Sequence, residues 1–169
     1  MDYLGRVAEL FVTAILLFFV PLSYMSAQSE LLCQTYVTTE TNYFVDSVRN
    51  IGFLNKEMYE EFVKKLAVTK MPYEITMSHY KSKMYPQEIE LEQISSYSTH
   101  YQAVYHEDIL ETILETERYS FGRGDFFSVS IEKKGETWND RIQNFLLGRN
   151  FKGQELQVIY GGAIRDEIR

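Results

Sequence analysis

The first apolar segment of the chain is long and uncharged at its centre. Residues 10–22 read LFVTAILLFFVPL, and the segment extends to residues 7–25 if Glu9, Thr13, Ser23 and Tyr24 are accepted as interruptions. At ~1.5 Å per residue, a helix of that extended length spans ~28 Å, just enough for the hydrocarbon core of a bilayer. The pattern predicts that residues 1–27 form a transmembrane anchor.

A cleaved signal peptide is the alternative for so short an apolar segment. Such a peptide has a basic stretch before the apolar run and small residues before the cleavage site. Here Asp2 offsets Arg6, and Met25 occupies the third position before the best candidate cut, which follows Ala27. These departures favour an uncleaved anchor.

The charges on either side of the segment predict its orientation. Arg6 precedes the apolar residues, whereas the first charges after them are Glu30, Glu40 and Asp46, and no lysine or arginine occurs before Arg49. Basic residues stay on the cytoplasmic side. We therefore expect a single-pass protein of the cell membrane with a cytoplasmic N-terminus and an extracellular domain over residues 28–169.

The helical pattern continues beyond the apolar segment. Cys33, Val37, Phe44 and Val48 recur at helical spacing, and residues 28–49 contain no glycine or proline. A continuous helix over residues 3–50 would be ~70 Å long. Pro21 removes one backbone hydrogen bond and is expected to kink this helix near the outer membrane interface. Gly52 is expected to end the helix.

The remaining segments predict short alternating elements. Asn55 is placed to cap a helix over residues 56–68, and further helices are expected over residues 107–117 and 137–147. Period-two alternation predicts strands at residues 73–78, 127–131 and 156–160, and Gly161-Gly162 suggests a bulge. Ile89 and Leu91 suggest a short exposed strand, while residues 95–105 have no clear period and are expected to form a loop or an irregular edge.

This order of elements predicts an α+β fold, with a small antiparallel sheet packed on the long helix and two or three short helices. The side chains expected to be buried together are Phe44, Phe62, Ile75, Val129, Phe145 and Val158. On the helix over residues 107–117, Ile109, Leu110, Ile113 and Leu114 are expected to face the core. Cys33 is the single cysteine, so no intramolecular disulfide supports that core, and Cys33 itself is expected to be a small packing residue.

The residues offer little chemistry. The formal charge of −7 argues against binding to a nucleic-acid backbone. The three histidines are expected to be exposed, and the spacing of His100 and His106 with Glu107 and Asp108 matches no compact metal-ligand pattern. Gly122-Arg123-Gly124 lacks the lysine and hydroxyl that end a phosphate-binding loop. We therefore expect no metal, no cofactor and no enzymatic activity.

Three segments carry a resemblance to a known family. The opening MDYLGRVAELF, the segment TNYFVDSVRNIGFLNKEMYEEFVKKLAVTKMPYEITM and the later GDFFSVSIE resemble small membrane-anchored proteins of Gram-positive bacteria that accompany Tad-like pilus or type II/IV-like secretion genes. The long helix on a small sheet is also the outline of type IV pilins and pseudopilins. The resemblance covers most of the chain and contains no diagnostic motif.

The resemblance implies an assembly role for three residues. Gly5 would occupy the prepilin cleavage position and Glu9 the position of the pilin glutamate, although Glu9 is fourth after Gly5 where pilins have it fifth, and Arg6 replaces an apolar residue. Two functions follow: a structural subunit of an extracellular filament or secretion apparatus, whose partners are lipid and other pilin-like or secretion subunits, its own copies included, or a non-polymerising accessory or binding protein of a conjugation or secretion machine. In the second case Glu9 only snorkels to the headgroups.

Overall fold

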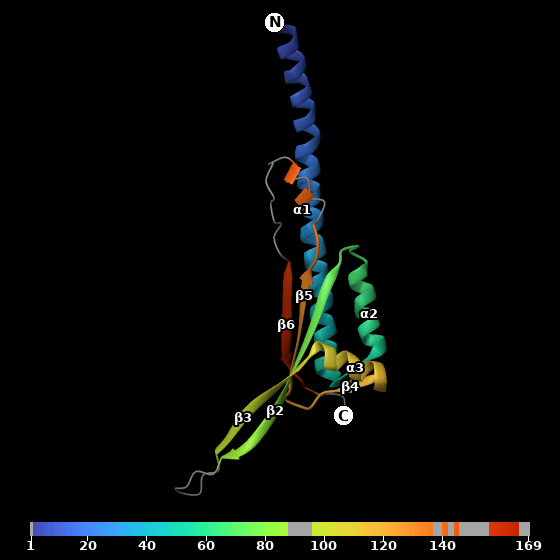
Figure 1. The fold of residues 1–169 in the computed structure, drawn as a ribbon, viewed down its shortest axis with the longest axis vertical. Coiled ribbons are helices and arrows are strands. Elements are labelled where there is room, and N and C mark those ends of the chain that lie inside the picture. Colours follow the sequence, from blue (N-terminus) through green and yellow to red (C-terminus); the bar gives the residue numbers. More distant parts are fainter. Residues whose placement is uncertain (1, 88–95, 137–139, 142–143, 146–155, 166–169) are drawn as a thin grey trace. The chain divides into compact units, whose positions relative to one another are not determined.

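One long helix opens the chain. A computed structural model describes residues 2–87, 96–136, 140–141, 144–145 and 156–165, and in it α1 runs unbroken over Asp2–Ile51 (Figure 1). This confirms the predicted continuation of the apolar helix into the amphipathic segment. Gly52 ends the helix as expected, because it adopts a left-handed φ of 78° and its N–H donates to the Val48 carbonyl over 2.8 Å.

The chain forms two compact units. One contains Met1–Tyr36 and Gly135–Glu155, and the other contains Val37–Lys134 and Leu156–Arg169. Helix α1 contributes its first part to one unit and its last part to the other. The predicted division of the chain at residue 27 stays a prediction.

In the second unit, a capped helix follows α1. Strand β1 (Phe53–Asn55) leads into α2 (Lys56–Ala67). The Asn55 side chain accepts a hydrogen bond from the Met58 N–H over 2.8 Å, which satisfies one of the free donors at the start of the helix. Phe62 and Leu66 are the buried residues of α2. The cap, the helix and the burial of Phe62 were predicted from the sequence.

Four antiparallel strands form the main sheet in the order β3-β2-β5-β6. They are β2 (Tyr73–Gln87), β3 (Ser96–Tyr105), β5 (Phe126–Lys133) and β6 (Gln157–Ala163). Helix α3 (His106–Thr116) follows β3, and β4 (Arg118–Ser120) pairs with β1 in a second, two-stranded sheet. Together with α1 and α2, these elements give the α+β architecture that the sequence predicts.

Strand β2 changes partners along its length. It pairs with β5 from Tyr73 to Tyr80 and with β3 from Ser78 to Gln87. Beyond Tyr80, therefore, β2 and β3 pair only with each other, and they form a two-stranded arm over residues 81–87 and 96–102 that leaves the sheet (Figure 1).

The core lies between one face of the sheet and the helices α1 and α2. The inward residues of the strands alternate with outward polar residues, as in any antiparallel sheet with one covered face. Phe44 of α1 stacks on Phe62 of α2 with ring centroids 4.2 Å apart and meets Phe127 of β5 edge to face. The buried apolar side chains are Val37, Phe44, Val45, Val48, Leu54, Phe62, Leu66, Met77, Ile109, Ile113, Tyr119, Phe121, Phe127, Val129, Ile131, Leu156, Val158 and Ile164. Ile75 is partly buried against them.

Two backbone predictions are wrong. Residues 96–105 form β3, not a loop or irregular edge, and the sequence shows no period there because most of β3 lies in the arm, away from the core. Gly161 and Gly162 form no bulge, since β6 pairs residue for residue with β5 through both glycines. Glycine is needed because a Cβ at Gly161 would lie 2.5 Å from the Ser128 Cβ, and the Arg49 guanidinium fills the side-chain space at Gly162.

Two side-chain predictions are also wrong. Leu114 is exposed, because α3 buries only the narrow stripe that contains Ile109 and Ile113. Phe145 is 77 % exposed and belongs to the first unit, where its ring stacks on Phe19 with centroids 6.3 Å apart. The helix predicted over residues 137–147 lies mostly outside the described residues, and so does the strand predicted around Ile89 and Leu91.

Candidate functional site

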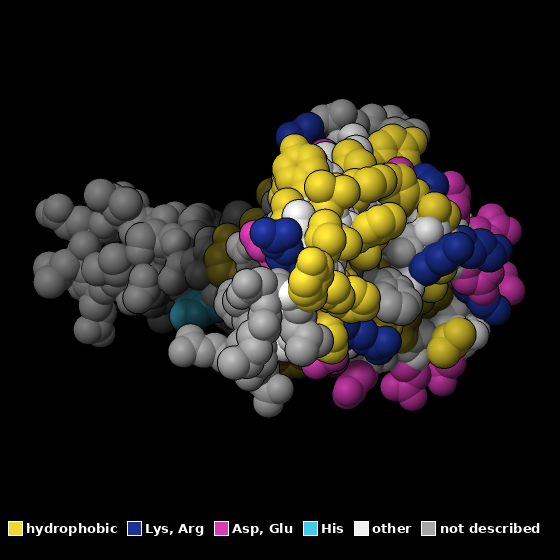
Figure 2. Space-filling view, turned by 90° about the horizontal axis from the view of Figure 1, so that it is seen from above, with side chains coloured by type: hydrophobic (Ala, Val, Ile, Leu, Met, Phe, Trp, Pro, Cys, Tyr) yellow, Lys and Arg dark blue, Asp and Glu magenta, His cyan; other side chains and the backbone are white. Residues whose placement is uncertain are grey.

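The first half of α1 exposes its apolar side chains in every direction. Ile15, Leu16, Leu17 and Phe18 are all exposed, and four consecutive positions cover a full helical turn. Figure 2, which views the molecule from the N-terminal side, shows hydrophobic side chains gathered at the centre of that face. Among the described residues, α1 is the one helix long and apolar enough to cross a membrane. Exposed apolar surface of this extent marks an interaction site, here with lipid or with other helices.

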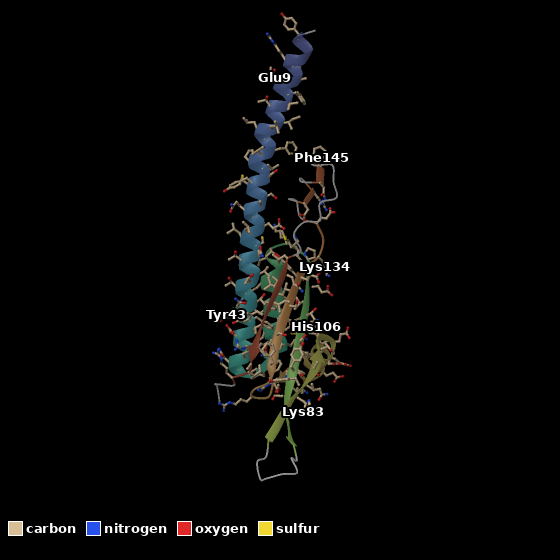
Figure 3. The ribbon with its side chains drawn as sticks, turned by 90° about the vertical axis from the view of Figure 1, so that its left-hand side faces the viewer. Glu9, Tyr43, Lys83, His106, Lys134 and Phe145 are labelled. Atoms are coloured by element: carbon tan, nitrogen blue, oxygen red, sulfur yellow. The ribbon has the colours of Figure 1, made fainter. Side chains whose placement is uncertain are left out.

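The three predicted assembly residues lie in the first turns of α1. Gly5, Arg6 and Glu9 are all exposed, and a Cβ at Gly5 would meet nothing within 4 Å. Gly5 and Glu9 share one face of the helix because they are four residues apart (Glu9 is labelled in Figure 3). The Glu9 carbonyl accepts a hydrogen bond from the Thr13 hydroxyl over 2.8 Å. Their roles in assembly stay predictions.

Pro21 lies inside α1, and the helix continues on both sides of it. The prediction that the helix is not broken at Pro21 is therefore confirmed. The kink expected there stays a prediction. Cys33, further along the same helix, is a partly buried free thiol.

A buried polar network lies inside the second unit, and the sequence reasoning missed it. His79 of β2 is fully buried, which corrects the expectation that all histidines are exposed. Its Nε2 lies 2.8 Å from Asp125 Oδ2, and its Nδ1 lies 2.8 Å from the Tyr119 hydroxyl. Because an ionised carboxylate can only accept, Nε2 donates to Asp125, and Nδ1 of the neutral ring accepts from Tyr119.

Asp125 also binds two backbone groups. Its Oδ1 accepts from the Ser82 N–H and its Oδ2 from the Gly122 N–H, each over 2.8 Å. Strand β5 begins at Phe126, and Tyr80 is the last residue of β2 that pairs with it. The Ser82 N–H, two residues further along β2, donates to the Asp125 carboxylate. The network therefore joins β2, β4 and the turn before β5 at the base of the arm.

Burial and partners shift the three pKa values of this network. Burial lowers the pKa of His79, although the hydrogen bond and the charge of Asp125 act to raise it. Burial, followed by the Asp125 charge, raises the pKa of Tyr119 to about 12. Burial alone would raise the pKa of Asp125, but its hydrogen bonds from Ser82, His79 and Gly122 together lower it. At neutral pH the network is thus a carboxylate, a neutral imidazole and a neutral phenol, which suits a structural clamp.

A signal for this network was present in the sequence. His79 continues the inward positions of the strand that contains Tyr73, Ile75 and Met77. A histidine at an inward position of a half-buried strand needs a polar partner, because an unpaired buried polar group is costly. The identity of the partner follows only from the register of β2 with β5.

A groove of about 300 Å³ lies between the last part of α1 and α2. Its floor includes Phe44 and Phe62, and Tyr43 forms part of its wall. Lys65 lies at the rim and forms ion pairs with Glu40 and Glu61 over 3.3 Å each. The three charged side chains that line this groove are therefore paired with one another.

The remaining histidines form no metal site with their neighbours. His106 Nδ1 accepts a hydrogen bond from the Met77 N–H over 3.2 Å, and His100 faces Lys83 across the arm. Within the part of the chain that the structure describes, no three side chains of histidine, cysteine, aspartate or glutamate lie close enough together to hold a metal ion.

Comparison with known proteins identifies no relative: no family model, no curated protein and no solved structure matches this chain.

Proposed function

We propose that this chain is a membrane-anchored, pilin-like structural subunit of an extracellular filament or of a type II/IV-like secretion apparatus. The observation that carries the proposal is the division of α1: its first half exposes apolar residues all round, and its last half is a wall of the core. Such a helix attaches the folded domain to its anchor with no linker between them. That arrangement suits a subunit that is held by its helix while its domain faces the outside.

In this proposal the N-terminus is cytoplasmic and the domain is extracellular. The support is the charge distribution, since Arg6 precedes the apolar segment and residues 26–48 contain no lysine or arginine. In the described part of the domain, the charges that line the groove are paired and His79 is buried, which supports a structural role for these residues.

Glu9 is the residue through which subunits would recognise one another. In an isolated anchor its carboxylate reaches the headgroups at little cost. In a packed array of such helices the carboxylate loses that route to water. It then needs a cation, which Arg6 or the amino terminus of a neighbouring copy would supply, and pairing in a low dielectric is strong only when both partners are present.

The test is a Glu9→Gln substitution, which removes the charge and keeps the shape. Tagged and untagged copies of the full chain are expressed together, and the untagged copy is measured after purification through the tag. We expect Glu9→Gln to leave membrane insertion intact and to abolish co-purification. Glu30→Gln, the same change at the first acidic residue after the apolar segment, is the matched control and should co-purify normally.

Equal co-purification of the wild-type chain and the Glu9→Gln variant would remove the residue-level argument for a filament subunit. It would favour the alternative of a membrane-anchored accessory or binding protein that never enters a filament.

A further inference from the structure

The connection between β5 and β6 belongs to the same compact unit as the apolar half of α1. Strand β5 ends at Lys133 and β6 begins at Gln157, and residues 135–155 between them form the first unit together with residues 1–36. Within this connection, the described residues 140, 141, 144 and 145 have helical backbone. The chain therefore returns to its apolar helix between two strands of the main sheet.

One face of α1 is covered within this unit. Among the described side chains of residues 5–22, Phe19 is the one that is not exposed, and half-buried positions continue at helical spacing with Ser23 and Ala27. The Ser23 hydroxyl itself is buried. The other segment of the unit is the connection, so the connection reaches α1 as far toward its N-terminus as Phe19.

Phe145 places an exposed ring at this point of α1. Its ring stacks on Phe19 with centroids 6.3 Å apart and an interplanar angle of 20°, yet Phe145 is 77 % exposed (Figure 3). Phe18, which neighbours Phe19 on α1, is equally exposed at 77 %. The connection thus widens the apolar surface of α1 with a ring that the protein leaves uncovered.

The level of Phe19 on α1 determines what surrounds Phe145. With residues 7–25 crossing the membrane, Phe19 lies ~9 Å inside the outer end of the crossing, at ~1.5 Å per residue. Interfacial helices bury their apolar faces to a similar depth, about 5–10 Å. The helical backbone at Phe145 also suits this position, because a helix satisfies its own backbone hydrogen bonds where water is absent.

The charges near Phe145 fit the surface of a membrane. Arg141 is exposed and, four residues before Phe145 in helical backbone, lies on the same face. An arginine at that place can extend its guanidinium to the headgroup phosphates while its alkyl stem stays among apolar groups. Asp140 is only 5 % exposed, so its carboxylate is covered by protein. The sequence of the connection adds residue types that interfacial helices insert into lipid, namely Trp138, Leu146 and Leu147.

We propose that the connection between β5 and β6 is a second membrane-binding element, which inserts Phe145 among the acyl chains of the outer leaflet and places Arg141 at the headgroup phosphates. The partner is the lipid of the membrane that α1 crosses, because Phe145 lies at the level of Phe19. The element gives the chain an attachment to the membrane in addition to α1. This inference rests on the proposed function, since it takes α1 as the anchor.

Fluorescence quenching by lipid tests the insertion. The full chain, in a Cys33→Ser background, carries Phe145→Cys with a nitrobenzoxadiazole label and is reconstituted into vesicles of phosphatidylcholine and phosphatidylglycerol. Part of the phosphatidylcholine bears a nitroxide on its acyl chain. Phe18→Cys, at the same exposure but on α1 itself, is the control inside the bilayer. Leu114→Cys is the control outside it, because Leu114 is an apolar residue of the second unit that is 69 % exposed.

We expect the label at Phe145→Cys to lose nearly as much emission to the nitroxide as the label at Phe18→Cys, and the label at Leu114→Cys to lose none. Quenching at Phe145→Cys as weak as at Leu114→Cys would overturn the inference. So would a label at Phe145→Cys that neither the nitroxide nor aqueous iodide quenches, because protein would then cover it. In both cases, strong quenching at Phe18→Cys leaves the anchor and the proposed function standing. If the label at Phe18→Cys is not quenched either, α1 does not lie in the membrane and the proposed function fails as well.

Discussion

Replacing Phe62 with alanine removes the side chain that joins the two helices of the core. Phe62 is 2 % exposed, and its ring lies nearly parallel to that of Phe44 with centroids 4.2 Å apart and an interplanar angle of 6°. Phe44 in turn meets Phe127 of the sheet. The substitution therefore leaves a cavity between α1, α2 and β5.

The expected cost is ~3–5 kcal/mol, the range for phenylalanine truncations in packed cores. The stacked pair with Phe44 favours the upper part of that range, since aromatic pairs add ~0.5–1.5 kcal/mol beyond burial. No disulfide can offset the loss, because the chain has one cysteine. At roughly 3 °C per kcal/mol for a domain of this size, the midpoint should fall by about 10–15 °C.

Phe145→Ala is the control of identical chemistry. Because Phe145 is 77 % exposed, its truncation should cost less than ~1 kcal/mol. The assay is thermal unfolding of the full chain in mild detergent, followed by near-ultraviolet circular dichroism, which reports the packing of the rings. A cost below ~1 kcal/mol for Phe62→Ala, or equal costs for the two variants, would refute the assignment of the core.

Two further predictions concern local stability. Because burial lowers the pKa of His79, the unfolded chain takes up a proton that the folded chain does not, so stability should fall as the pH drops below about 6.5, and His79→Gln should reduce that slope in unfolding measured at several pH values. A slope unchanged by His79→Gln would show that another group controls it. Asn55→Ala removes the cap of α2 and should cost about 1 kcal/mol in denaturant unfolding, and a cost near zero would mean that the 2.8 Å bond to Met58 contributes nothing.

The elements with a strong local pattern were predicted from the sequence. The continuous helix, the Asn55 cap and the alternating strands around Ile75, Val129 and Val158 each follow from residues near one another in the chain. These signals depend on helical or period-two spacing, which side-chain burial imposes directly.

The predictions that failed concern features that depend on contacts between residues far apart in the sequence. Strand β3 shows no period because most of it lies in the arm, away from the core, with β2 as its one neighbour. The role of Gly161 follows from the approach of Ser128 across the sheet, and that of Asp125 from the register that brings it to His79. Phe145 fits an apolar helical stripe, yet it lies outside the unit that contains the core.

The same distinction, between features with a local sequence pattern and features without one, holds for the candidate site. The exposed apolar half of α1 was predicted, because no folding partner is needed to recognise a long uncharged segment. The buried network was not, since His79, Tyr119 and Asp125 are far apart in the sequence and meet only in the folded domain.

Protease treatment of intact cells tests most directly the claim that α1 anchors an extracellular domain. The chain carries a small N-terminal tag, and the cells are probed with an antibody to the tag after the protease has been added outside. The account predicts that the domain is digested while a short tagged fragment containing the anchor remains in the membrane. A full-length chain that becomes sensitive only after the cells are opened would contradict it.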